Sequence, residues 1–97
     1  MSHASREVTV LNEQGFHARP AMKFVDAATG FESDVQLTKL PGPDNPDPET
    51  VDGKSIMFVL TLMGAIGTTY RIEADGTDAE AAVNTLAQLF AAKFDEE

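Results

Sequence analysis

The sequence predicts an α+β domain in which helices cover one face of an antiparallel sheet. Two patterns alternate along its 97 residues. In the shorter stretches every second residue is apolar, as in strands, and in the longer ones apolar residues recur at helical spacing. Taken in order they give strand, helix and strand, then an apolar stretch at residues 56–63 that either pattern fits, and finally a strand and a helix. This order in one short chain indicates a sheet with its helices on one side.

The first three elements follow from the pattern of apolar residues. Residues 7–11 alternate apolar and polar side chains, which predicts a strand followed by a turn. Residues 18–29 carry their apolar side chains on one helical face, and Gly30 provides a C-terminal stop for that helix. Residues 34–38 alternate again, which predicts a second strand with a solvated polar face.

The stretch from residue 40 to 52 is a Pro-rich acidic region within the single domain expected for residues 1–97. Residues 40–48 hold four of the five prolines, which excludes an internal helix or a central strand. We expect a stiff surface loop here, which at this length is either functional or disordered.

The tripeptide Gly-Lys-Ser at 53–55 is similar to the end of a nucleotide-binding loop. Pro48 stands where that motif requires a glycine, so this interpretation fails. Ser55 is instead placed to cap a short helix that begins at Ile56. Residues 56–63 are almost wholly apolar, so periodicity does not distinguish a strand from a helix there, and their β-branched content favours a strand.

The last two elements are a strand and a long helix. Gly64 and Gly67 bracket a turn before residues 69–74, which alternate as a strand does. Residues 77–80, Thr-Asp-Ala-Glu, match a capping box. An apolar stripe at helical spacing follows and predicts a helix that ends near Phe94, before a short acidic tail.

Composition narrows the classes of function. A formal net charge of −9 argues against binding nucleic acid, whose phosphates attract a basic surface, so we expect protein partners. The absence of cysteine excludes a disulfide framework and a thiolate metal site, and it fits the reducing cytoplasm. No apolar run approaches the roughly 18 residues that span a bilayer, so we expect no membrane insertion.

Residues 15–21, Gly-Phe-His-Ala-Arg-Pro-Ala, bring together a nucleophile, a cation and a helix start. Pro20 is tolerated only in the first turn of a helix, so His17 lies at the N-terminus of the helix that contains it. Free amides and the positive end of the helix dipole suit a phosphate group there. The guanidinium of Arg19 matches phosphate oxygens, and a neutral imidazole has a ring nitrogen free to attack phosphorus. The set predicts a phosphohistidine site.

On physical grounds alone, a single histidine near a helix start is more often a solvated or capping residue. The motif at 15–21, however, resembles the active-site signature of HPr, the histidine-containing phosphocarrier family of the bacterial phosphotransferase system. The similarity runs from residue 8 to 31 and resumes from 53 to about 94. Only residues 40–52 fit the family pattern poorly.

The resemblance implies an HPr-like open-faced sandwich in the order strand, helix, strand, strand, helix, strand, helix. It has a four-stranded antiparallel sheet, with the third strand at residues 49–52, and three helices on one face, the second of which begins at Ile56. It implies that His17 carries phosphate on Nδ1, with Arg19 and the backbone amides of Ala18 and Arg19 around the phosphoryl group. It further implies that phosphate comes from phosphoenolpyruvate through enzyme I and passes to the IIA domains of sugar permeases. Such a protein is a covalent carrier and not a stand-alone enzyme, and neither a cofactor nor a metal is implied.

The resemblance also implies two roles around residue 55. Ile56, Met57 and Leu60 look like the apolar patch by which HPr proteins dock their partners, with ordinary core packing as the alternative for each. Ser55 lies in a segment similar to the one that a dedicated HPr kinase/phosphorylase modifies in many bacteria, with a plain N-cap as the alternative.

Two other interpretations stay open. The first is a regulatory HPr paralogue that does not serve sugar uptake. Asp26 and Thr29 stand where family members often carry lysines, which weakens electrostatic complementarity to an acidic enzyme I. The nearby cations that remain are Arg19, Lys23 and Lys54. The second is a small α+β ligand-binding or interaction module in which His17 is incidental. In either carrier role we expect a monomer, because a carrier meets successive partners.

Overall fold

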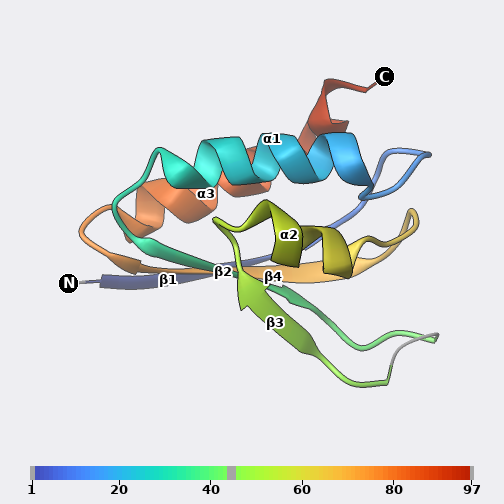
Figure 1. The fold of residues 1–97 in the computed structure, drawn as a ribbon, viewed down its shortest axis with the longest axis horizontal. Helices are drawn as coiled ribbons and strands as arrows, with labels where there is room; N and C mark the ends of the chain where they lie inside the picture. Colours follow the sequence, from blue (N-terminus) through green and yellow to red (C-terminus); the bar gives the residue numbers. More distant parts are fainter. Residues whose placement is uncertain (1, 44–45, 97) are drawn as a thin grey trace.

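The computed structural model describes residues 2–43 and 46–96, and its elements follow the predicted order (Figure 1). The strands and helices are β1 (Ser2–Thr9), α1 (Ala18–Thr29), β2 (Asp34–Lys39), β3 (Glu49–Asp52), α2 (Ile56–Val59), β4 (Thr69–Gly76) and α3 (Ala79–Ala91). Two single 3-10 turns, η1 (Leu60–Leu62) and η2 (Lys93–Asp95), follow α2 and α3. The helix at Ile56, which the apolar pattern left open, is confirmed.

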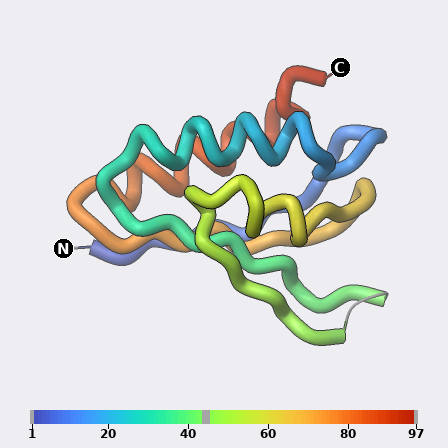
Figure 2. Tube along the Cα trace, viewed as in Figure 1, coloured from blue at the N-terminus to red at the C-terminus, as the bar shows by residue number. Residues whose placement is uncertain are grey.

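The sheet has the strand order β1-β4-β2-β3, and each neighbouring pair is antiparallel. In Figure 1 the helices α1 and α3 run side by side over one face of the sheet, and α2 lies beside α1 on the same side. The tube in Figure 2 shows that the opposite face carries no helix in the described chain. The predicted open-faced sandwich is therefore confirmed.

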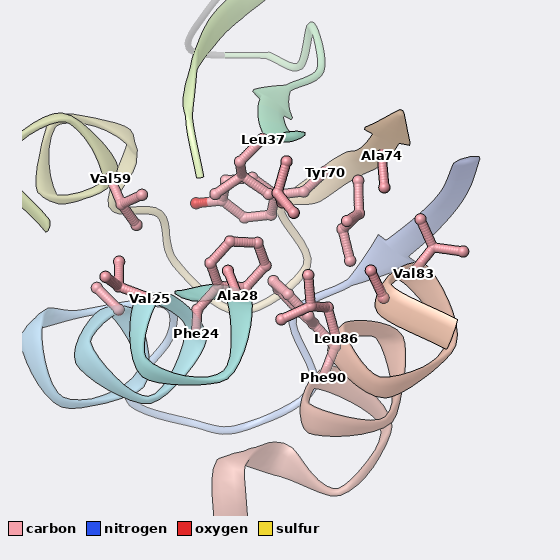
Figure 3. Close-up of a cluster of buried hydrophobic side chains, with 14 of the residues drawn as sticks. Phe24, Val25, Ala28, Leu37, Val59, Tyr70, Ala74, Val83, Leu86 and Phe90 are labelled. Carbon is pink, nitrogen blue, oxygen red and sulfur yellow. The ribbon is translucent and has the colours of Figure 1, made fainter. Parts of the chain in front are cut away.

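The core lies between the sheet and the helices, where apolar side chains of α1 and α3 meet those of β2 and β4 (Figure 3). Its largest fully buried side chains are aromatic: Tyr70, Phe16, Phe24, Phe90 and Phe94. The rings of Phe16 and Phe90 stack with centroids 5.5 Å apart, and Phe94 meets Phe90 edge-on at 4.8 Å. Burying each such ring stabilises the fold by about 1.5–3 kcal/mol relative to leaving it exposed. This cluster fixes the start of α1 against the end of α3.

The segment after α2 is fixed to the sheet by a buried hydrogen bond. The Tyr70 hydroxyl donates to the Leu62 carbonyl, and burial raises the pKa of this hydroxyl well above its ordinary value. Val59 and Leu62 are fully buried beside it. The short helix therefore has one face in the core, and its other face is exposed.

The first strand lies earlier in the chain than its apolar alternation predicts. β1 covers Ser2–Thr9 rather than residues 7–11, because its first half pairs with the second half of β4, from Ser2 opposite Gly76 onward. Of residues 2–6 only Ala4 is buried, so this half shows no apolar alternation. Backbone pairing with a neighbouring strand can thus extend a strand into residues whose sequence shows no alternation of apolar and polar side chains.

The expected capping box at residues 77–80 is wrong. The N-cap of α3 is Asp78, and its side chain makes no hydrogen bond to the helix. The carboxylate instead accepts from the amides of Glu32 and Ser33 at 2.9 Å each and from the Ser33 hydroxyl at 2.5 Å. Tertiary partners in the connection between α1 and β2 have replaced the local cap.

The remaining sequence predictions around the sheet are confirmed in part. β2 and β3 form as predicted, but Thr38 on the expected solvated face of β2 is buried and its hydroxyl lies 2.7 Å from that of Thr50. In the Pro-rich loop, residues 41–43 and 46–48 are exposed, and residues 44–45 lie outside the described residues. Within the described chain no helix is long and apolar enough to cross a membrane.

Candidate functional site

The predicted helix start at His17 is confirmed. α1 begins at the next residue, and His17 is its N-cap, with an extended backbone (φ −115°, ψ −164°) and a carbonyl that accepts from the Ala21 amide at 3.0 Å. Its side chain makes no capping bond to the helix. Among the described residues no acceptor meets the amides of Ala18 and Arg19. The positive end of α1 is therefore open at His17.

The residues before His17 hold it on the core. Gly15 has a positive φ of 80°, and a Cβ there would lie 2.5 Å from the Gly64 carbonyl oxygen, so only glycine fits. Phe16 pairs with Gly64 as an antiparallel bridge, with N···O distances of 2.7 and 3.1 Å. Its ring is fully buried in the aromatic cluster. His17 thus extends from a backbone fixed on both sides.

The imidazole of His17 lies against a carboxylate from the far end of the described chain. Its Nε2 is 3.0 and 3.2 Å from the two carboxylate oxygens of Glu96. The Arg19 guanidinium is 3.9 Å from the same carboxylate. Asn12 donates from its side-chain amide to Glu96 at 2.8 Å and to the Gly15 carbonyl at 2.7 Å. No hydrogen bond to Nδ1 of His17 occurs among the described residues, so that nitrogen is the available one.

Glu96 reaches His17 through an unusual backbone turn. Lys93, Phe94 and Asp95 have φ values of 56°, 53° and 60°. The left-handed region costs a residue other than glycine roughly 1–2 kcal/mol. Among the contacts that hold the turn, Phe94 is fully buried in the aromatic cluster, and Lys23 donates from Nζ to the Phe94 carbonyl at 2.6 Å.

Two of the three nearby cations are bound to backbone carbonyls. Lys23 binds the carbonyl of Phe94, and Lys54 donates from Nζ to the Phe31 carbonyl at 2.8 Å. Arg19 differs, because its side chain is 73% exposed. It is therefore the cation best placed to meet a phosphate on His17.

The predicted docking residues differ in exposure. Met57 is 79% exposed, but Ile56 and Leu60 are half-buried and pack against the core. Two exposed apolar residues were missed, Phe58 and Met22, at 58% and 57%. Exposed apolar side chains thus occur on α2 and on α1, the helix that begins after His17, and Leu11, Met63 and Ile66 are exposed as well.

Ser55 is the N-cap of α2, as predicted, and its hydroxyl accepts from the Phe58 amide at 3.4 Å. The phosphorylation expected from the resemblance would fall on that oxygen.

Sequence reasoning missed Asn12 and Glu96 as neighbours of His17. Residues 12–15 were predicted only as a turn and residues 95–97 only as an acidic tail. Glu96 lies 79 positions from His17 in the chain. No periodicity or motif indicates a contact of that separation.

The arrangement defines a class of protein: a small α+β domain that presents a histidine with one free ring nitrogen at an open helix N-terminus beside an exposed arginine. Within the described residues no group of three or more acidic or histidine side chains forms a metal site. Such a site is suited to holding a phosphoryl group by charge and hydrogen bonds.

Comparison with known proteins identifies the family. Residues 4–92 match the family model described as the HPr component phosphorylation site of the phosphotransferase system. The phosphocarrier protein HPr of Pseudomonas aeruginosa is 38% identical over 90 residues, 93% of each chain. That of Treponema pallidum is 37% identical over 92 residues, 95% of this chain and 97% of its own. The chain belongs to the HPr family of phosphocarrier proteins.

Solved structures agree with this assignment. HPr from Thermoanaerobacter tengcongensis is 34% identical and superposes with a TM-score of 0.78, covering 100% of this chain and 99% of its own. The Bacillus subtilis catabolite repression containing protein Crh is 37% identical, with a TM-score of 0.63 over 95% of this chain and 93% of its own. Its structure is described as a dimer formed by domain swapping.

Proposed function

We propose that the protein accepts phosphate on Nδ1 of His17 from phosphorylated enzyme I and passes it to the IIA domains of sugar permeases. The observation that carries this proposal is the state of His17: its Nε2 contacts Glu96, its Nδ1 has no hydrogen-bond partner among the described residues, and α1 begins behind it with open amides. The side chain is 31% exposed, so a donor protein can reach the ring.

The surrounding groups supply what phosphoryl transfer requires, which is positioning and charge stabilisation. The open amides of Ala18 and Arg19 and the α1 dipole provide fixed positive charge. The Arg19 guanidinium can bind two phosphate oxygens at once. The His17 ring lies at the surface, so a partner protein has to supply the rest of the reaction site. The protein is therefore a covalent carrier in the cytoplasm rather than a stand-alone enzyme.

The docking surface for both partners is proposed to be the apolar area of α2 and η1, with Ile56, Met57 and Leu60. Phe58 and Met22 extend it toward α1. Large apolar side chains grouped next to a reactive residue are typical of a protein interface. A monomer suits this surface, because the same face serves successive partners.

The direct test is incubation with phosphoenolpyruvate and enzyme I, followed by mass measurement. The expected result is one added phosphate that is lost in acid and is mapped to His17. Unchanged mass with an active enzyme I would contradict the carrier function and favour an interaction module in which His17 is incidental.

A regulatory paralogue is the second candidate, because the surface around His17 offers little free positive charge. Lys23 and Lys54 are engaged by backbone carbonyls, and Asp26 is exposed on α1. An acidic enzyme I would bind such a surface weakly. Transfer from phosphorylated protein to IIA domains separates the two: a sugar-transport carrier passes its phosphate on, and a regulatory paralogue retains it.

A further inference from the structure

The contact between His17 and Glu96 fixes which ring nitrogen carries hydrogen. A carboxylate only accepts hydrogen bonds, so Nε2, at 3.0 Å from it, must donate. In the neutral imidazole the lone pair then lies on Nδ1, the nitrogen with no partner among the described residues. The carboxylate therefore selects the tautomer that can attack phosphorus through Nδ1.

We propose that Glu96 is a positioning residue for His17, which orients the ring and offsets the charge that phosphorylation creates on it. This inference rests on the proposed carrier function. In the transfer step the Nδ1 lone pair forms the nitrogen–phosphorus bond, and the bond from phosphorus to the donor protein breaks with its electron pair leaving on the donor. The ring keeps its Nε2–H and becomes positively charged beside the carboxylate. No proton has to move.

The return step uses the same contact. When the phosphoryl group passes to an acceptor, the electron pair of the nitrogen–phosphorus bond returns to Nδ1 and the ring is neutral again. A carboxylate that holds a histidine by its second nitrogen and stabilises its charged form is a device that serine hydrolases also use. Here it would serve a histidine that is the nucleophile itself.

Three features show that Glu96 is held for this contact. Its side chain is only 9% exposed, although it belongs to a surface segment. Asn12, which is 1% exposed, binds both the carboxylate and the Gly15 carbonyl, and so links Glu96 to the loop that carries His17. The left-handed turn at 93–95 directs the chain to this place, and such strained residues persist only where the surroundings hold them.

The position of Arg19 is compatible with this role. Its guanidinium lies 3.9 Å from Glu96, farther than either His17 or Asn12, and its side chain is mostly exposed. The carboxylate already accepts hydrogen bonds from His17 and Asn12, so the mostly exposed guanidinium can turn to a phosphoryl group on His17 without leaving Glu96 unpaired.

The first experiment reads the ring directly by proton–nitrogen NMR of the unphosphorylated protein at alkaline pH. In the wild type we expect His17 to be the Nε2–H tautomer, with an Nε2–H proton slow enough in exchange to be observed. Glu96→Ala should abolish that signal and raise the Nδ1–H fraction. His3, which is exposed and lies 2.7 Å from Asp75 through Nδ1, should be unchanged and is the internal control. Identical His17 signals in both proteins would overturn the proposal.

The second experiment measures transfer from phosphorylated enzyme I with two matched variants, Glu96→Gln and Asp95→Asn. Each replaces one carboxylate by an amide at the same end of the described chain, but of the two only Glu96 contacts His17. We expect Glu96→Gln to lower the maximal rate roughly tenfold with an unchanged KM, the lower end of the 10–100-fold loss found when the partner that orients a metal-bound histidine is removed. Asp95→Asn should match wild type. Equal rates in all three, or equal losses in both variants, would overturn the role of Glu96 alone. Failure of the wild type to accept phosphate would instead contradict the carrier function.

Discussion

The N-terminal ends of α1 and α3 are built alike, but only the N-cap residue of α1 keeps an atom available for reaction. Each helix begins at a polar N-cap residue, His17 or Asp78, whose side chain makes no hydrogen bond to its own helix. Each side chain instead contacts a segment distant in the chain: His17 contacts Glu96, and Asp78 contacts Ser33 and the Glu32 amide. The contact with Glu96 leaves Nδ1 of His17 without a partner among the described residues, whereas the contacts of Asp78 leave no nucleophilic atom available.

The difference lies in the chemistry of the two side chains. The Asp78 carboxylate accepts three hydrogen bonds, which hold its pKa below the ordinary value of 3.8, chiefly through the Ser33 hydroxyl. It is anionic at neutral pH, and its role is to join α3 to the connection between α1 and β2. The His17 ring uses one nitrogen for Glu96 and keeps the other free. A helix start thus becomes a candidate site when its cap residue retains an unsatisfied nucleophilic atom.

The largest effect is expected for His17→Ala, which should abolish phosphate acceptance and leave the fold intact. The His17 side chain is 31% exposed, and among the described residues its hydrogen bonds go to Glu96 alone, so the free energy of unfolding should change by no more than about 1 kcal/mol. Circular dichroism tests whether the fold is intact, and the assay with phosphoenolpyruvate and enzyme I tests whether phosphate is accepted. If the variant still gains acid-labile phosphate, His17 is not the carrier, and His3, the other histidine, becomes the candidate.

The converse is expected for Asp78→Ala, which removes the acceptor of three hydrogen bonds at the other helix start. The melting temperature should fall, because the amides of Glu32 and Ser33 lose their partner. Phosphate acceptance by His17 should stay at the wild-type rate below the melting transition. A variant as stable as the wild type, or one that is folded but does not accept phosphate, would contradict the division between the two helix starts.

The loss of stability expected for Asp78→Ala should depend on pH. The folded pKa of Asp78 is depressed, so its contribution to stability is complete above the unfolded pKa and is lost as pH falls through the folded pKa. The difference in melting temperature between wild type and Asp78→Ala should therefore be constant near neutral pH and shrink below the ordinary value of 3.8. Melting curves over this range measure it, and a difference independent of pH would show that the charge of Asp78 is irrelevant.

An intermediate effect is expected for Arg19→Lys at the α1 start. Lysine keeps the charge but loses the planar fork that binds two phosphate oxygens. Transfer at saturating enzyme I should slow roughly tenfold, less than the hundredfold typical of losing an oxyanion donor altogether. Binding to enzyme I should change less than the rate does. Equal maximal rates for the two proteins would show that Arg19 acts only as a generic cation.

The sequence predicts one of these helix starts far better than the other, for a physical reason. At α1 the signals are local: Pro20 fixes the first turn, and His17 and Arg19 lie within three residues of Pro20. At α3 the local signal was misleading, because Asp78 binds partners 45 and 46 residues away instead of closing a capping box. Glu96 was missed likewise, since its place depends on Phe94 entering the core and on a left-handed turn. The order of elements is a local property and was predicted, but the partners of exposed charges are set by the completed fold.

The start of α2 provides a third case, because Ser55 is the one cap of the three whose side chain bonds its own helix. The bond to the Phe58 amide is long, at 3.4 Å, so Ser55→Ala should lower the free energy of unfolding by only about 0.5 kcal/mol. Its larger effect is expected when charge is added. A phosphoserine brings roughly −1.5 to −2 charges next to the proposed docking surface, where contact with a partner would carry a desolvation penalty.

Ser55→Asp should therefore slow phosphate acceptance by His17 several-fold, while Ser55→Ala should match wild type. The two variants differ in charge at one position, which makes each the control of the other. Ser55 caps α2 and contacts none of His17, Arg19 or Glu96 among the described residues. A charge at Ser55 should therefore weaken binding of enzyme I rather than slow the chemical step, and the slower rate should appear as a higher KM for enzyme I. Equal KM values for the Asp and Ala variants would remove the docking effect. Failure of a purified HPr kinase to modify wild-type Ser55 would leave this residue as a helix cap alone.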